Sequence, residues 1–152
     1  ARIKAEAFCK ASGLPTVADD SGLCTDALNG APGVYSARYA GHHGDDDANN
    51  EKLLRELEGV SVRDAAFVCC IACAFPDSMP ARDFTVYGAT PGEILCAPRG
   101  ENGFGYDPLF WYDDLGKTFA EMTPEEKNSL SHRARATVKL AERFANMIIV
   151  GE

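Results

Sequence analysis

Residues 63–75 read RDAAFVCCIACAF and form a near-continuous apolar run that is long enough for one β-strand. A strand that is covered on both faces has this composition, because neither of its faces meets water. The run therefore predicts the central strand of a sheet that has further structure on both sides.

Shorter apolar stretches surround this strand on both sides in the sequence. Together with the neighbouring turn residues they predict strands at residues 14–17, 84–87, 93–96 and 109–111. The segment from Gly88 to Gly92 is predicted to join the second and third of these as a connection. Helices are predicted at residues 1–12 and 48–58, and from Thr123 and Ser131 onward. Strands mixed with helices predict a single α/β domain.

The predicted helices carry recognisable end signals. Gly13 follows the first helix in the C′ position, where a left-handed residue closes a helix. Thr123, Pro124 and Glu126 match an N-cap, a first helical residue and the acidic member of a capping box. The last helix is predicted to bury one face, formed by Val138, Ala141, Phe144, Ala145 and Ile148.

Length, composition and charge limit the classes of function. The chain has 152 residues, 45% of them hydrophobic and 25% charged, as expected of a globular protein with a sizeable core. Its formal net charge is −8, which argues against a protein that grips nucleic-acid backbones with a basic face. A small anionic ligand stays compatible with this charge if a metal ion and a few local cations attract it.

Three of the six cysteines lie inside the central apolar run. The six are Cys9, Cys24, Cys69, Cys70, Cys73 and Cys96. Cys70 and Cys73 form a CxxC, but no second CxxC or histidine pair stands at zinc spacing. Reduced core thiols are therefore favoured over a metal or redox site, and they predict a reducing, cytoplasmic location. The sequence has no signal peptide and no long apolar span.

Residues 18–23, ADDSGL, place two adjacent carboxylates, a hydroxyl and a glycine after a short apolar stretch. The pattern predicts a tight turn between two apolar segments. Such a turn is either simply solvated, because Asp, Ser and Gly are common turn residues, or it binds a cation. Adjacent carboxylates are costly to desolvate without a cation, and oxygen ligands of this kind suit Mg²⁺.

Two further stretches have the residue types of a binding site. Residues 99–108, RGENGFGYDP, combine three glycines with two aromatic rings, so the backbone can approach a ligand while a ring stacks on it. His132 and Arg133 fall in the first turn of the last helix. Cations oppose the helix dipole at this end, so helix stability does not explain them, and an anionic or carbonyl partner does.

Six motifs now stand in one order with compatible spacing. They are residues 18–23 (ADDSGL), 31–39 (APGVYSARY), 103–108 (GFGYDP), 116–122 (GKTFAEM), 126–128 (EKN) and 131–133 (SHR). In these motifs the chain resembles the inosine/xanthosine triphosphate pyrophosphatase family over essentially its whole length. The resemblance implies a mixed, curved central sheet flanked by helices in two lobes, with a nucleotide cleft between them. It also implies a homodimer and Mg²⁺-dependent hydrolysis of ITP, dITP or XTP to the monophosphate and pyrophosphate.

The same resemblance implies roles for individual residues. Asp20 is the expected general base and metal ligand, with Asp19 beside it, and Ser21 is expected to contact the substrate. Phe104, Gly105, Tyr106 and Asp107 would form the base-binding loop, with Phe104 or Tyr106 supplying the stacking face. Lys127, His132 and Arg133 would reach the carbonyl groups of the base.

One part of the family pattern is not found in these residues. Members usually begin with a strand and a Ser/Thr-x-Asn-x-x-Lys loop that holds the triphosphate, followed by a metal-binding glutamate. We therefore expect residues 1–152 to be one domain that is incomplete at its N-terminal end. Three alternatives stay open: a non-catalytic nucleotide-binding or dimerisation fragment, a cysteine-based metal or redox protein, and a pyrophosphatase for modified pyrimidine nucleotides.

Overall fold

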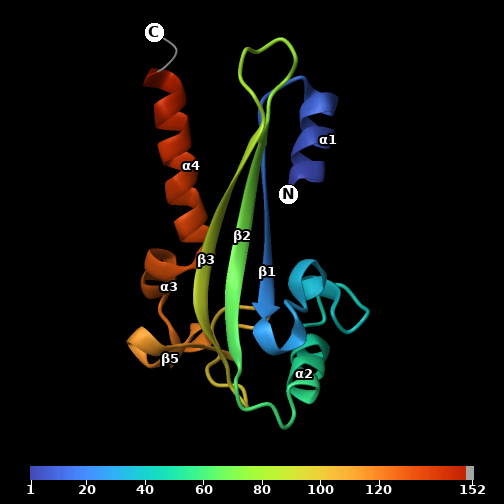
Figure 1. Cartoon of the computed structure of the whole chain (residues 1–152), viewed down its shortest axis with the longest axis vertical. Helices are drawn as coiled ribbons and strands as arrows, with labels where there is room; N and C mark the ends of the chain where they lie inside the picture. The colour runs from blue at the N-terminus through green and yellow to red at the C-terminus, as the bar shows by residue number, and fades with distance from the viewer. Residues whose placement is uncertain (150–152) are drawn as a thin grey trace. The chain divides into compact units, whose positions relative to one another are not determined.

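The computed structural model describes residues 1–149, with side chains up to Met147 (Figure 1). The α-helices are α1 (Arg2–Ser12), α2 (Asp46–Glu56), α3 (Pro124–Leu130) and α4 (His132–Ile149). The strands are β1 (Thr16–Thr25), β2 (Asp64–Ala74), β3 (Phe84–Ile94), β4 (Phe110–Tyr112) and β5 (Lys117–Thr118). Four 3₁₀ helices complete the chain: η1 (Asp26–Leu28), η2 (Gly33–Arg38), η3 (Asp113–Leu115) and η4 (Phe119–Glu121). Within residues 1–149 no helix combines the length and the apolar character that crossing a membrane requires.

The five strands form one sheet in the order β1-β2-β3-β4-β5. β4 is antiparallel to both of its neighbours, with Glu93 opposite Trp111 and Tyr112 opposite Lys117. The apolar run at residues 63–75 forms β2, and it has a strand on each side. The prediction of an α/β fold built on a central strand at residues 63–75 is confirmed.

The chain divides into two compact units. The first unit comprises Ala1–Asp20, Cys69–Ala89 and the chain from His132 onward, and the second comprises Ser21–Val68 and Thr90–Ser131. Strands β1, β2 and β3 therefore each contribute residues to both units. The expectation of one domain, incomplete at its N-terminal end, stays a prediction.

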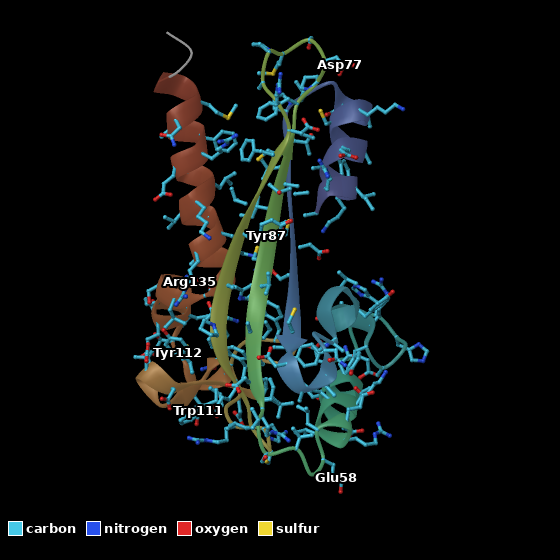
Figure 2. The ribbon with its side chains drawn as sticks, viewed as in Figure 1. Glu58, Asp77, Tyr87, Trp111, Tyr112 and Arg135 are labelled. Carbon is cyan, nitrogen blue, oxygen red and sulfur yellow. The ribbon has the colours of Figure 1, made fainter. Side chains whose placement is uncertain are left out.

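In the first unit, α1 and α4 pack on opposite faces of the strands. Ala72 and Ala74 of β2 pack with Ala5 and Cys9 of α1. On the opposite face of β2, Cys69 and Ile71 pack with Ala136 and Leu140 of α4. Successive side chains point to opposite faces of a strand, so Ala72 and Ala74 face α1 whereas Cys69 and Ile71 face α4. Figure 2 labels Tyr87 of β3 and Arg135 of α4, which both belong to this unit.

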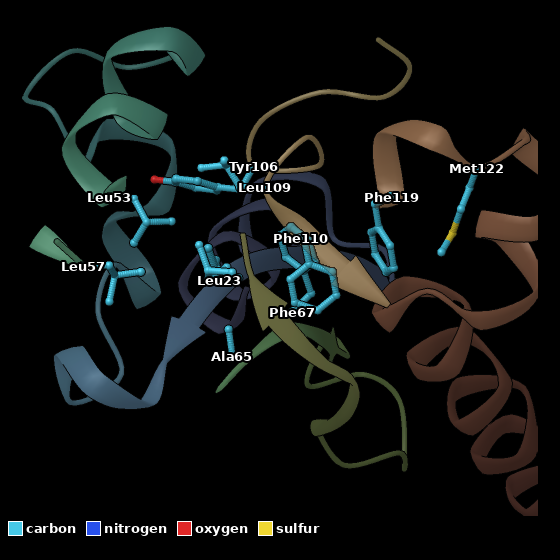
Figure 3. Packing of buried hydrophobic residues seen from close by; sticks show 11 residues of the cluster. Leu23, Leu53, Leu57, Ala65, Phe67, Tyr106, Leu109, Phe110, Phe119 and Met122 are labelled. Carbon is cyan, nitrogen blue, oxygen red and sulfur yellow. The ribbon is translucent and has the colours of Figure 1, made fainter. Parts of the chain in front are cut away.

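The second unit has the larger apolar core. Three rings lie at its centre: Phe67 of β2, Phe110 of β4 and Phe119 of η4 (Figure 3). Their centroids are 4.5, 4.8 and 5.4 Å apart, within the range of favourable aromatic pairs. The core is completed by Leu23, Leu53, Leu57, Ala65, Ile94, Tyr106, Leu109 and Met122.

The predicted helix ends are confirmed where they carried sequence signals. Gly13 has φ 70° and ψ 13° after α1, and its N–H donates to the carbonyl of Cys9. Thr123 and Glu126 form the full capping box of α3, with Pro124 as the first helical residue. Local side-chain to backbone bonding was sufficient to place these boundaries.

The prediction of a tight turn at residues 18–23 is wrong. These residues lie inside β1, which runs without interruption from Thr16 to Thr25. Gly22 is needed for close approach rather than for a turn, because a Cβ on it would lie 2.5 Å from the carbonyl oxygen of Gly33. Asp19 and Asp20 therefore sit on an extended strand, where neighbouring side chains point to opposite faces.

The prediction of two strands at residues 84–87 and 93–96 is also wrong. They form the single strand β3, and both glycines of the supposed connection lie within it. A Cβ on Gly88 would lie 2.2 Å from the carbonyl oxygen of His132 in α4, and a Cβ on Gly92 would lie 2.4 Å from the carbonyl oxygen of Trp111. Both glycines serve close packing, which sequence cannot distinguish from a turn.

The predicted buried face of the last helix is wrong except for Phe144, which is packed as predicted. Val138 is 58% exposed, Ala141 and Ala145 are exposed, and the side chain of Ile148 lies outside the described residues. The packed side of α4 runs instead along Ala136, Leu140 and Phe144, of which Phe144 contacts Phe84 edge-on. The helix is rich in alanine, so apolarity alone supports more than one stripe, and contact with β3 selects this one.

Of the three cysteines predicted to be buried in the central run, Cys69 and Cys73 are buried and Cys70 is partly buried. All six are free thiols, and Cys9, Cys69 and Cys73 are buried. Burial is the main reason that the pKa of Cys73 lies above its ordinary value, and Asp83 adds to the shift. A raised pKa disfavours the thiolate that metal binding and redox chemistry require. Cys70 and Cys73 are also three residues apart on one strand, so they point to opposite faces.

Candidate functional site

The first unit holds the two carboxylates, His132 and Arg133. The Arg133 guanidinium donates from Nε to Oδ2 of Asp19 over 2.9 Å, which joins the start of α4 to β1. Lys4 donates from Nζ to the backbone carbonyl of Asp19 over 2.7 Å. The carboxylate of Asp20 is 57% exposed. The neighbouring carboxylates thus have different cationic partners: Asp19 is paired with the Arg133 guanidinium, and Oδ2 of Asp20 lies 3.8 Å from the N-terminal ammonium of Ala1.

The ion pair between Asp19 and Arg133 is about half exposed on both sides. Pairs at this level of exposure contribute about 0–1 kcal/mol to stability. The ion pair therefore matters for position more than for stability, because it holds the Arg133 side chain next to β1.

His132 is the first residue of α4 and is 9% exposed. Its backbone lies directly over Gly88 of β3, since a Cβ on that glycine would be 2.2 Å from the His132 carbonyl oxygen. Arg135 and Lys139 then donate to the backbone carbonyls of Ala89 and Tyr87. The start of α4 is consequently held against β3 by backbone contact and by two cationic side chains.

The second unit holds residues 103–107 (GFGYD), which we call the aromatic loop. The backbone N–H of Phe104 donates to Oδ2 of Asp107 over 3.1 Å, so the loop closes on itself. Gly103 has φ +75°, and a Cβ there would lie 2.1 Å from the same carboxylate oxygen. Glycine is therefore needed at this position for both conformation and space.

Asp107 is 3% exposed and forms an ion pair with Lys127, with 2.5 Å between Oδ2 and Nζ. Burial raises the pKa of the Asp107 carboxyl, and the hydrogen bond and charge of Lys127 oppose this shift. A buried charge without such a partner would be strongly unfavourable. The Lys127 ammonium also lies 4.7 Å from the centroid of the Phe104 ring, which is cation–π distance.

The two rings of the aromatic loop have different environments. Tyr106 is 5% exposed, and its hydroxyl donates to the backbone carbonyl of Ser36 over 2.7 Å. Phe104 is 67% exposed. Tyr106 is thus an anchor in the core, and Phe104 is the ring with an open face for stacking.

Ser21 is the residue of β1 that follows Asp20, and its Oγ is buried. It has no hydrogen-bond partner within the part of the chain that the structure describes. A buried hydroxyl without a partner is unfavourable, so a ligand that bonds to it would remove this cost.

Three residues next to these groups were not predicted from sequence as part of a site. Asp46 and Asn50 of α2 bond to the backbone of Gly105, and Ser36 of η2 accepts from Tyr106. The only sequence signal for the first two was their i, i+4 spacing, which places both on one face of a helix. Ser36 lies in residues 31–39, a motif that the sequence analysis had noted without assigning a role to it.

The donor set for a metal ion is sparse. Among residues 1–149 there is no group of three or more His, Cys, Asp or Glu side chains that could hold one. Mg²⁺ needs no such cage, because it often binds through one or two carboxylates together with substrate phosphates and water. The exposed carboxylate of Asp20 fits that mode.

The predicted site residues therefore gather in two groups. The first unit brings Asp19 and Arg133 into contact, with Asp20 and His132 next to them in the chain. The second unit brings Phe104 and Asp107 together with Lys127. The roles assigned to these residues, and the use of both groups by one ligand, stay predictions.

Known proteins match the chain over nearly all of its length. The model of the Ham1 family matches residues 1–143. A dITP/XTP pyrophosphatase of Syntrophobacter fumaroxidans is 52% identical over 145 residues, which are 95% of this chain and 61% of that protein. A dITP/XTP pyrophosphatase of Geobacillus kaustophilus is 52% identical over 149 residues, which are 96% of this chain and 71% of that protein.

Two solved structures have the same fold. The Ham1 protein of Staphylococcus aureus superposes with a TM-score of 0.87 at 46% identity, covering 94% of this chain and 72% of that one. A HAM1 protein of Coxiella burnetii gives a TM-score of 0.88 at 45% identity, covering 95% of this chain and 74% of that one. The chain thus spans about three fifths to three quarters of the length of these relatives.

Proposed function

Because this chain belongs to the Ham1 family, we propose that it hydrolyses the non-standard purine nucleoside triphosphates ITP, dITP and XTP to the monophosphate and pyrophosphate. The names of the relatives, dITP/XTP pyrophosphatases at about half identity, support this substrate class and reaction. Such an enzyme removes damaged purine nucleotides before they are used.

The observation that carries the proposal is the aromatic loop with Lys127. The open ring of Phe104 offers a stacking surface, and the Lys127 ammonium beside it is held by the buried carboxylate of Asp107. Lys127, His132 and Arg133 are donors that pair with a 6-keto oxygen and have no partner in the 6-amino group of adenine. A donor left unpaired in a buried site costs about 1–3 kcal/mol, which corresponds to roughly tenfold or more per contact.

The chemical step in this proposal belongs to the acidic pair. Asp20 accepts the proton of the water that attacks the α-phosphorus, and its exposed carboxylate would also hold Mg²⁺. Bound Mg²⁺ would neutralise charge on the triphosphate and on the leaving pyrophosphate. Asp19 stands beside Asp20 and orients Arg133, and the Ser21 hydroxyl bonds to the substrate.

The proposal extends to the setting of the enzyme. It acts as a homodimer in the cytoplasm, where its free thiols stay reduced. Its partner is a small anionic nucleotide rather than a nucleic-acid polymer or a membrane, in keeping with a net charge of −8.

The test is release of pyrophosphate from ITP in the presence of Mg²⁺, with ATP as the comparison substrate. Asp20→Asn should abolish release, because the amide accepts no proton and binds the cation weakly. Asp77→Asn is the matched control, since it removes an exposed carboxylate from the first unit outside the site. Full activity of Asp20→Asn would remove this residue from its role. Release of orthophosphate would move the protein to another class of hydrolase, and nucleotide binding without turnover would favour the non-catalytic fragment.

A further inference from the structure

Both polar groups of the Gly105 peptide backbone are held by helix α2. The Gly105 N–H donates to Oδ2 of Asp46 over 2.8 Å, and the Gly105 carbonyl accepts from Nδ2 of Asn50 over 2.9 Å. Asp46 and Asn50 are four residues apart, so they face the loop from the same side of the helix. The loop residue is 59 and 55 positions away in the sequence, so this contact is purely tertiary.

Neither side chain is needed to form α2. The N-cap of this helix is Asp45, whose Oδ1 accepts from the N–H of Ala48 over 3.1 Å. Asp46 lies in the first turn, where the helix dipole favours a carboxylate, and its carboxylate is directed to the loop instead of to a free N–H of its own helix. The contact therefore serves the loop.

The clamped residue controls the orientation of the exposed ring. Gly105 has φ +59° and separates Phe104 from Tyr106, whose ring is fixed in the core through Ser36. Tyr106 therefore holds the C-terminal side of the loop. The bond to Asp46 holds the peptide group between Phe104 and Gly105, and the bond from Asn50 holds the peptide group between Gly105 and Tyr106, so α2 restrains the backbone next to the Phe104 ring.

We propose that Asp46 and Asn50 are positioning residues that preset the aromatic loop for stacking of the purine base. They act through Gly105 and touch neither the phosphates nor the reacting atoms. This inference rests on the proposed function, because it takes the aromatic loop as the base-binding element. A loop that is already held in its binding conformation loses little conformational entropy when the ligand binds. Loss of the two hydrogen bonds that join Asp46 and Asn50 to Gly105, which we call the clamp, should therefore weaken the affinity for the nucleotide and leave the chemical step unchanged.

The variants are Asp46→Ala and Asn50→Ala, with Asp47→Ala as the matched control. Asp47 is an exposed acid in the same first turn, so its removal changes the net charge and the helix dipole in the same way. Asp46→Asn is the conservative variant, because its amide oxygen can still accept from Gly105. Asp46 is exposed and Asn50 is partly buried, so the fold is expected to survive both replacements, and thermal unfolding checks this.

The first readout is steady-state hydrolysis of ITP. Asp46→Ala and Asn50→Ala should raise KM about tenfold with little change in kcat, a ratio that corresponds to about 1.4 kcal/mol. Asp47→Ala should match the unaltered protein, and Asp46→Asn should recover most of the loss. Equal KM values for Asp46→Ala and Asp47→Ala would overturn the inference and leave the proposed function standing.

The second readout is binding of IMP without Mg²⁺, measured by equilibrium dialysis, which reports on the base site alone. The same roughly tenfold weakening is expected in Asp46→Ala and Asn50→Ala. If the unaltered protein binds IMP and releases no pyrophosphate from ITP, weaker IMP binding in the variants still supports the clamp, and only the proposed activity fails. A protein that neither hydrolyses ITP nor binds IMP would overturn both.

Discussion

Replacing Gly88 of β3 with alanine adds a single methyl group at the place where helix α4 lies on the sheet. In the structure a Cβ at this position would lie 2.2 Å from the carbonyl oxygen of His132 and 2.3 Å from the backbone nitrogen of Ala136. These are backbone atoms of a helix, so no side-chain rotation can relieve the clash. The first two turns of α4 have to move away from β3.

The size of the movement follows from these distances. Ordinary contact begins at 3.4 Å, so α4 has to retreat by about 1.2 Å near His132. This separates Ala136 and Leu140 from Cys69 and Ile71 in the core of the first unit. Overpacking of this kind costs about 1–3 kcal/mol. At roughly 2–4 °C per kcal/mol for a chain of this size, the melting temperature should fall by about 2–12 °C.

The same retreat has a consequence for the site. The hydrogen bond from Arg133 Nε to Asp19 Oδ2 is 2.9 Å, and a displacement of about 1.2 Å at the start of α4 disturbs its geometry. Under the proposed function, Gly88→Ala should therefore also raise KM for ITP.

The assays are thermal and urea unfolding followed by circular dichroism, with Gly13→Ala as the control in the same unit. A Cβ on Gly13 meets nothing within 4 Å, and its φ of +70° gives only the local backbone cost of alanine, about 1 kcal/mol. Gly13→Ala should leave KM unchanged. A Gly88→Ala protein with unaltered stability and unaltered KM would refute the packing of α4 on this glycine.

Three more substitutions test other parts of the second unit. Phe119→Ala should lower the free energy of unfolding by about 3–5 kcal/mol, measured by urea denaturation, because its ring is fully buried between two other rings. Arg63→Lys should lower it by about 1.5–3 kcal/mol in the same measurement, because its guanidinium donates to four backbone carbonyls that one ammonium cannot reach together. Glu126→Gln tests pH dependence: bonds from Lys117 and from the N–H of Thr123 hold the pKa of Glu126 below its ordinary value of 4.5. A lowered pKa contributes stability above pH 4.5 that is lost as the pH falls through the folded value, so Glu126→Gln should be less stable at neutral pH and should lose less on acidification. Parallel acid titrations of the two unfolding midpoints would contradict this reasoning.

Sequence reasoning was sufficient for features that depend on neighbours along the chain. The central strand, the C-terminal Gly13 of α1 and the capping box of α3 all follow from local hydrogen bonding and from apolar runs. The site residues were suggested by ordered motifs, and the structure brings Phe104, Asp107 and Lys127 together as the motifs implied. Asp46 and Asn50 stayed hidden, because their partner is a backbone peptide more than fifty residues away.

By itself the sequence determined the α/β class, the C-terminal end of α1, the N-terminal end of α3 and the family to which the chain belongs. Only the tertiary structure decided that residues 18–23 continue a strand, that Gly88 lies inside β3 and which side of α4 is packed. The physical reason is the same in each case. A glycine permits both a turn and a close approach, and an alanine-rich helix has several apolar stripes, so the choice depends on which distant backbone comes within contact distance.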